Sequence, residues 1–164
     1  MEPSEKPGFV IREAQPADFA GVQVLEDLDF SVHAKARPDY FREAPVSYPQ
    51  SEFEELLSKP CPLALVAEAK DELVGLCFGF VTDHPGDAFC KPRRFALIQD
   101  LVVLPQYRGR GIASALLNAA RQRAVQAGAV SLELCVWEFN DGARALYDKL
   151  GMRVQYSRME MNLT

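Results

Sequence analysis

The sequence predicts a mixed α/β fold in a single domain, and two observations carry this prediction. The first is the order of elements: a strand and two helices, then a meander of three strands, then strand–helix units. The second is FALIQDLVVLPQYRGRGIASALL at residues 95–117, which indicates a buried strand, a glycine-rich turn and a helix. Because helical crossovers join parallel strands and tight turns join antiparallel ones, we expect a mixed, mostly antiparallel sheet flanked by helices.

The helices are predicted from apolar spacing and from residues that start or end helices. Apolar residues recur at helical spacing after Pro16, and Ser51 with Glu54 has the pattern of a capping box. Gly128 and Gly151 stand where helices commonly end. Helices are therefore predicted at residues 16–34, 51–59, 112–127 and 141–150.

The strands are predicted from short apolar or alternating runs that turn residues bound. Lys70 and Asp71 form a tight turn between two such runs, which is a hairpin signal. Pro105 ends the long strand before the glycine-rich turn. Strands are therefore predicted at residues 9–12, 63–69, 72–82, 94–104 and 132–136, with one or two more in 152–163.

Composition excludes several classes of function. The formal net charge of −5 argues against a general nucleic-acid binder, and no apolar run approaches the roughly 20 residues that span a bilayer. We expect residues 1–8 to be a disordered lead without a secretion signal, and residues 9–164 to form the domain. The four cysteines show no metal-ligand spacing, so we expect no metal and a reducing cytoplasm, with Cys77 and Cys135 as buried thiols.

The glycine-rich turn indicates an anion site. Arg108, Gly109, Arg110 and Gly111 lie between a strand and a helix, where unpaired backbone N–H groups and the positive end of a helix dipole coincide. The two arginines suit a phosphate or pyrophosphate. The same glycines also suit a purely structural turn. The spacing matches neither a P-loop nor a dinucleotide-binding pattern.

A second pattern is CVWEFNDGARALYDKLGM at residues 135–152. Asn140 lies just before a predicted helix and Tyr147 lies two turns further on, so both side chains share one helix face. Asparagine also caps helices, and tyrosine also packs in cores with its hydroxyl at the edge. Spacing alone favours these structural roles.

Together the two patterns resemble the GNAT superfamily of acetyl-CoA-dependent N-acetyltransferases. The sequence VxPxxRGxGIAxxLL, followed by VWEFNxxAxxLYxxxGM, is similar to the superfamily over residues 95–152. Arg108, Gly111 and Ala113 carry its signature, Arg/Gln-x-x-Gly-x-Gly/Ala. The resemblance implies the superfamily fold, in which two parallel strands splay apart and the thioester of acetyl-CoA lies in the gap.

The resemblance also implies contacts to acetyl-CoA. Backbone amides of the turn would bind the pyrophosphate, Arg108 and Arg110 would add charge, and the strand edge would pair with the pantetheine arm. Asn140 would contact that arm, Ala143 would leave room for it, and Tyr147 would protonate the leaving thiolate. The remaining contact residues are Gly109, Gly111, Ile112, Ala113 and Ser114 in the turn, and Leu101, Val102 and Val103 on the strand.

The implied reaction is direct attack of a primary amine on the acetyl carbonyl, and it requires a base. Some superfamily members place a glutamate on the strand before the turn, where this chain has Leu97 and Gln99; Gln99 can hold only a water. Glu138, at the mouth of the splay, is the leading candidate base. Asp100 follows it, but regular alternation turns Asp100 to the opposite face unless a bulge rotates the strand. Both carboxylates also suit solvated positions.

The sequence leaves the acceptor open. Its site is expected around the first helices and their connecting loop, at His33, Arg37, Tyr40 and Phe41. The acidic residues Glu26, Asp27 and Asp29 suit either a cationic acceptor or a solvated helix face. A small amine or polyamine is the first expectation, and a protein or peptide amine the second. The alternative function is a non-catalytic acyl-CoA-binding sensor or scaffold. The resemblance is compatible with a homodimer through the last strands, although nothing in residues 152–164 demands one.

Overall fold

In this computed structural model, which describes residues 8–43 and 47–163, one sheet contains five strands. The expected lead lies outside the described residues except for Gly8. The strands, in sheet order, are β1 (Val10–Glu13), β2 (Leu65–Ala69), β3 (Glu72–His84), β4 (Arg93–Val103) and β5 (Ser131–Leu134). The helices are α1 (Phe19–Ala36), α2 (Gln50–Ser58), α3 (Ile112–Gln126) and α4 (Asp141–Lys149).

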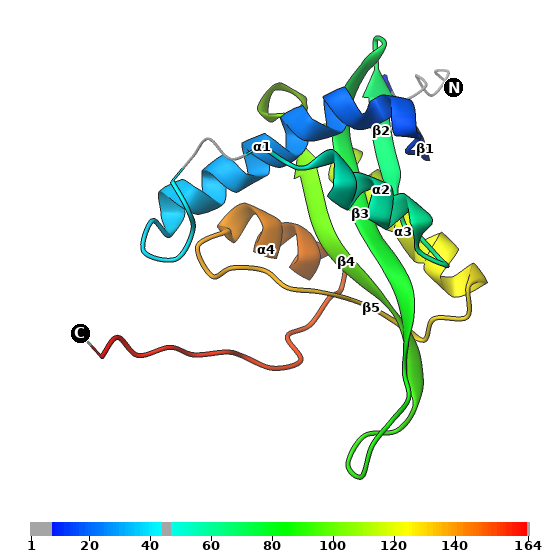
Figure 1. Cartoon of the computed structure of the whole chain (residues 1–164), viewed down its shortest axis with the longest axis vertical. Coiled ribbons are helices and arrows are strands. Elements are labelled where there is room, and N and C mark those ends of the chain that lie inside the picture. The colour runs from blue at the N-terminus through cyan, green and yellow to red at the C-terminus, as the bar shows by residue number, and fades with distance from the viewer. Residues whose placement is uncertain (1–7, 44–46, 164) are drawn as a thin grey trace, which may run out of the picture.

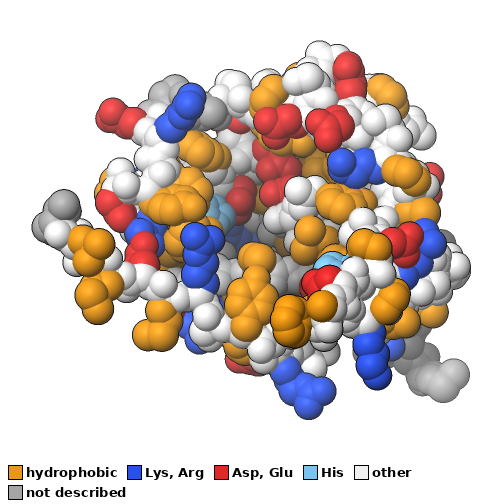
Figure 2. Space-filling model, turned by 60° about the horizontal axis from the view of Figure 1, so that its bottom comes forward, with side chains coloured by type: hydrophobic (Ala, Val, Ile, Leu, Met, Phe, Trp, Pro, Cys, Tyr) orange, Lys and Arg blue, Asp and Glu red, His pale blue; other side chains and the backbone are white. Residues whose placement is uncertain are grey.

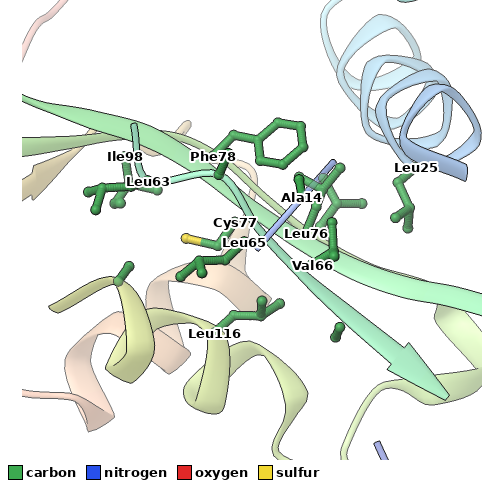
Figure 3. Close-up of a cluster of buried hydrophobic side chains, with 14 of the residues drawn as sticks. Ala14, Leu25, Leu63, Leu65, Val66, Leu76, Cys77, Phe78, Ile98 and Leu116 are labelled. Carbon is green, nitrogen blue, oxygen red and sulfur yellow. The ribbon is translucent and has the colours of Figure 1, made fainter. Parts of the chain in front are cut away.

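The sheet is mixed, as the sequence predicts. Strands β1 to β4 pair antiparallel with their neighbours, whereas β4 and β5 pair parallel through the α3 crossover. Helices α1 and α2 lie over one face of the sheet and α3 lies over the other (Figure 1). Phe78 lies on the side of Leu25 in α1, and its neighbour Cys77 lies on the side of Leu116 in α3 (Figure 3). The core therefore forms on both faces of the central strands.

The turn between β2 and β3 confirms the predicted hairpin. Lys70 and Asp71 both adopt left-handed backbone conformations, with φ of 51° and 62°. Two consecutive left-handed residues give the turn a twist that matches the right-handed twist of the strands. The predicted helix ends are also confirmed, because Gly128 and Gly151 follow α3 and α4, both with φ of 81°.

Three expectations about local structure are wrong. Ser51 and Glu54 form no capping box, because Pro49 is the N-cap of α2 and Ser51 already lies inside the first turn. Cys135 is exposed rather than buried, because β5 ends one residue earlier. Residues 152–163 form no strand: no other strand of the described chain pairs with them, and they run away from the body as an extended segment (Figure 1).

Candidate active site

The site begins where β4 and β5 part. Their parallel pairing runs from Phe95–Ser131 to Ile98–Leu134 and ends there, although β4 continues to Val103. On this side of β4, beyond Ile98, the backbone groups have no strand partner within the described chain. The stretch that contains Leu101, Val102 and Val103 is therefore an open strand edge, as the sequence comparison with the superfamily implies.

The glycine-rich turn presents backbone amides at the end of β4. Gly109 and Gly111 both have left-handed backbones, with φ of 76° and 81°, and an added Cβ at either position would meet no atom. The glycines are therefore required by the backbone conformation and not by packing. Gly111 is the N-cap of α3, and its carbonyl accepts from the N–H of Ala115 at 2.9 Å. The amides of the turn before that bond, at Ile112, Ala113 and Ser114, have no acceptor inside the helix.

The two arginines of the turn lie on its surface. The Nε of Arg108 donates to the carbonyl of Val103 at 3.1 Å. The guanidinium of Arg110 lies 5.0 Å from the centre of the Tyr107 ring and donates to the carbonyl of Gln106 at 3.1 Å. Both arginines belong to the turn that leads into α3, so the turn combines oriented N–H groups with positive charge.

A pocket of about 60 Å³ lies next to the gap. It admits a few waters or one small functional group. Figure 2 shows acidic side chains and a histidine gathered in a hollow of this surface. The lining residues come from α1, β4, the segment after β5 and α4: Asp29, His33, Gln99, Asp100, Leu101, Cys135, Val136, Trp137, Asn140 and Tyr147.

A bulge in β4 brings Asp100 to this pocket. Phe78 pairs with Asp100, but the next residue, Gly79, pairs with Ile98, so Gln99 is an extra residue in β4. Phe78 and Gly79 point to opposite faces of the sheet, and Asp100 therefore faces the α1 side together with Phe78. A Cβ on Gly79 would lie 2.2 Å from the carbonyl oxygen of Leu97, so only glycine fits opposite the bulge. The bulge therefore turns the Asp100 side chain as the sequence analysis requires of a candidate base.

Asp100 lies among other acidic groups. Burial raises its pKa to about 6, and the charges of Asp29 and Glu52 add to this effect, whereas His33 opposes it. Hydrogen bonding to Asp29 raises the pKa of His33, whose Nδ1 lies 2.9 Å from the carbonyl oxygen and 3.3 Å from a carboxylate oxygen of Asp29. The pocket thus combines a carboxylate that titrates near neutral pH with an Asp–His pair.

Glu26 is also a member of this cluster, and its burial rules out the solvated helix face that the sequence allowed for it. Its side chain is only 7% exposed, and its Oε1 has no hydrogen-bond partner within the described chain. Burial, followed by the charge of Asp100, raises its pKa to about 9. The available signal was its position in α1: Glu26 adjoins Leu25 and lies one turn after Val22, both of which are fully buried.

The expected acceptor residues form an aromatic group at the mouth of the pocket. The rings of Tyr40 and Phe41 lie 5.1 and 5.3 Å from Trp137, and His33 lies 5.5 Å from Phe41. The guanidinium of Arg37 lies 5.4 Å from the centre of the Trp137 ring. The loop after α1 is therefore fixed onto the segment after β5, and the structure brings together all four expected acceptor residues.

The structure also places the other expected site residues. Asn140 caps α4, accepting from the N–H of Ala143 at 3.2 Å, and its side chain also lines the pocket. Tyr147 is partly buried, and burial, then Cys77 and Asp29, raises its pKa to about 12. Glu138 is exposed and is not among the pocket-lining residues of the described chain.

Comparisons with known proteins agree with this geometry. Residues 30–152 match the model of the acetyltransferase (GNAT) family. A point mutant of the BH1408 protein from Bacillus halodurans is 29% identical, over 94% of this chain and 99% of its own, with a TM-score of 0.90. An acetyltransferase from Trypanosoma brucei is 20% identical, over 94% and 99% of the two chains, with a TM-score of 0.68. The aminoglycoside N-acetyltransferase AAC(6')-Iy, solved with CoA, is 15% identical over the same shares, with a TM-score of 0.72. Within the described residues, none of the helices has the length and hydropathy of a membrane span.

Proposed function

Because this chain belongs to the acetyltransferase (GNAT) family, we propose that it transfers the acetyl group of acetyl-CoA to a primary amine. One observation carries the proposal: the glycine-rich turn and the pocket of Asp100 and Tyr147 lie along the same open edge of β4. A phosphate-bearing chain held at the turn can follow that edge, which leads to the pocket.

The described residues fit acetyl-CoA in three ways. The amides of the turn and the charges of Arg108 and Arg110 suit its pyrophosphate. The open edge at residues 101–103 suits the amide groups of the pantetheine arm, which would pair as an added strand does. Asn140, at the start of α4, borders the same gap, and the N–H of Ala143 donates to its side chain.

Asp100 is the group that we propose as the base. A pKa of about 6 leaves it mostly ionised at pH 7 and able to take a proton from the acceptor ammonium, directly or through a water held by Gln99. The amine nitrogen then attacks the acetyl carbonyl carbon, the C–N bond forms and the C–S bond breaks. Tyr147, neutral with a pKa of about 12, gives its phenolic proton to the departing thiolate, and the second proton that the nitrogen loses as the amide forms restores the phenol through solvent. We prefer Asp100 to Glu138 because Glu138 is exposed outside the pocket lining.

The acceptor that suits the pocket is a small cationic amine or a polyamine. Asp29 and Asp100 attract an ammonium, and the pocket volume of about 60 Å³ admits the terminal amine but not a bulky group. The aromatic mouth offers π faces over which a further cationic or apolar part of the acceptor can lie. A peptide amine is the second choice of acceptor. We also propose a cytoplasmic enzyme, consistent with its four free thiols.

An amine panel that follows release of free CoA tests this function. The panel contains polyamines, amino acids, a lysine peptide and an aminoglycoside, the last because one structural neighbour is an aminoglycoside acetyltransferase. Transfer to polyamines with kcat/KM above that for neutral amino acids supports the proposal. Tight binding of acetyl-CoA without transfer to any amine would instead support the alternative, a non-catalytic acyl-CoA sensor or scaffold.

A further inference from the structure

Glu26 is a buried carboxyl group that the proposed mechanism does not use. Its residue surface is only 7% exposed, and its enclosed Oε1 has no hydrogen-bond partner within the described chain. Burial without a partner costs free energy, and a bound ligand with a suitable donor can relieve that cost. Glu26 is therefore a candidate for contact with a ligand.

The other acidic residues of α1 already have partners. A carboxylate oxygen of Asp27 accepts from the backbone N–H of Tyr48 at 2.7 Å, and this bond fixes the segment before α2 on α1. A carboxylate oxygen of Asp29 lies 3.3 Å from Nδ1 of His33. Among the acids of α1 in the described chain, Glu26 is thus the one with an enclosed and unpaired oxygen.

Glu26 adjoins the acidic wall of the pocket. After burial itself, the charges of Asp100 and Asp29 raise the pKa of Glu26 most, and both of these side chains line the pocket. Glu26 and Asp29 are three residues apart on α1, so they lie one turn apart on the same side of the helix, with about 5–6 Å between their Cβ atoms. Glu52 of α2 adds a further negative charge. The acidic surface therefore extends beyond the pocket, along α1.

We propose that Glu26 binds a second ammonium group of the acceptor, so that the enzyme selects short α,ω-diamines over monoamines. This inference rests on the proposed function, in which one amine of the acceptor lies beside Asp100. An ammonium supplies both the charge and the donors that a buried carboxylate lacks. A separation of about 5–6 Å between the two positions corresponds to a spacer of about three or four methylene groups. A monoamine fills only the first position.

Binding of the second ammonium should release a proton. Burial, followed by the charge of Asp100, raises the pKa of Glu26 to about 9, so Glu26 is protonated at pH 7 in the free protein. Pairing with an ammonium favours the carboxylate, and the carboxyl proton passes to the solvent. Because this ionisation costs less as the pH approaches 9, the affinity for a diamine should rise from pH 7 to pH 9 relative to that for a monoamine.

Other groups near Glu26 also titrate or carry charge. In the described chain they include Asp27, Asp29 and His33 on α1, Tyr48 before α2, Glu52 on α2 and Asp100 on β4. Their charges act on monoamines and diamines alike. The ratio of the two affinities, compared between the wild type and Glu26→Gln, therefore isolates the contribution of Glu26.

Calorimetry of the full chain with CoA, which carries no acetyl group, tests the subsite without acetyl transfer. Titrations of diaminobutane and butylamine at pH 7, in two buffers of different ionisation enthalpy, count the protons released. We expect about one proton per diaminobutane in the wild type, and almost none for butylamine or for Glu26→Gln with either amine. Failure of diaminobutane to bind, binding without proton release, or equal release in Glu26→Gln would overturn the proposal.

Steady-state kinetics test the selectivity. The kcat/KM for diaminobutane and diaminopropane should exceed that for butylamine by roughly 10–100-fold, the usual effect of a charged hydrogen bond, and diaminooctane should lose this advantage. Glu26→Gln should lose most of the ratio between diaminobutane and butylamine. Glu54→Gln, which removes the same charge from the exposed side of α2, should keep it.

The two tests distinguish this inference from the proposed function. Acetylation of diaminobutane and butylamine with equal kcat/KM would refute the subsite and leave the proposed function intact. Proton release from Glu26 on diamine binding, without acetyl transfer to any amine, would support the subsite and refute the proposed function.

Discussion

Asp100→Asn should make the protein inactive and, at neutral pH, more stable. In the folded protein the pKa of Asp100 is about 6, above its ordinary value of 3.8, because burial disfavours the charged form. Stability from this group is therefore complete below pH 3.8 and is lost as the pH rises towards 6. At pH 7 the folded protein holds an ionised carboxylate where the neutral acid is preferred, and asparagine removes that cost.

The magnitude follows from the two pKa values. A difference of about two units corresponds to about 3 kcal/mol at pH 7, of which roughly 0.5 kcal/mol is already present at pH 4. The gain in unfolding free energy from Asp100→Asn should therefore grow by about 2–3 kcal/mol between pH 4 and pH 7. For a chain of this length that is a rise of about 4–12 °C in Tm relative to the wild type. The change with pH is the decisive quantity, because any hydrogen-bond cost of the new amide is the same at both pH values.

The assay combines denaturant unfolding at pH 4 and 7 with the pH profile of kcat/KM. Below pH 6 the wild-type kcat/KM should fall about tenfold per pH unit, and Asp100→Asn should lose roughly 10²–10⁴-fold at pH 7. Glu138→Gln is the matched control, since it neutralises an exposed carboxylate and should change neither measurement. A stability gain that stays constant from pH 4 to 7, or an Asp100→Asn enzyme with wild-type turnover, would refute the reasoning.

Three further predictions concern other parts of the site. Gly111→Asp should abolish acetyl-CoA binding in calorimetry, because the backbone is strained at φ 81° and the carboxylate repels the pyrophosphate. The control Gly128→Asp, which is equally strained at the other end of α3, should still bind acetyl-CoA. Equal affinities of the two variants would show that the cofactor does not bind at this turn. Tyr147→Phe should reduce kcat by roughly ten- to a thousandfold and leave acetyl-CoA affinity intact, and an unchanged kcat would remove its role as the acid. Glu26→Gln should stabilise the protein at pH 7 by up to about 3 kcal/mol, because a pKa of about 9 keeps the folded-state acid protonated while the unfolded chain ionises near pH 4.5. A stability difference that is independent of pH from 4 to 7 would contradict the raised pKa of Glu26.

The parts of the fold that depend on residues close together in the chain could be predicted from the sequence. The hairpin at Lys70 and Asp71, the glycines after α3 and α4, and the turn from β4 into α3 each depend on residues that are close in the chain. Their backbone conformations are set within a few residues. The glycine-rich turn could likewise be predicted as an anion site from its own residues, whereas the individual contacts to acetyl-CoA follow only from the resemblance to the GNAT superfamily.

The proposed acceptor half of the site depends on contacts between distant segments, which the sequence does not specify. The burial of Glu26 results from the packing of α1 on the sheet, although the neighbours of Glu26 in the chain are acidic. Residues 159–163 alternate apolar and polar side chains as a strand does, but within the described chain they pair with no strand. Alternating apolar and polar residues indicate that a segment can form a strand, but they do not indicate where its partner strand lies.

The bulge opposite Gly79 has a consequence for how this site could change. Gly79 has no side chain and lies on β3, yet its lack of a Cβ lets β4 hold an extra residue. Alanine at this position would place its Cβ against the carbonyl oxygen of Leu97. A shift of the C-terminal half of β4 into the regular register would relieve that clash and turn Asp100 towards α3. The position of the charged group is thus encoded on a neighbouring strand. A comparison of related chains that follows only titratable residues would therefore miss a substitution at Gly79, although that substitution would move the proposed base.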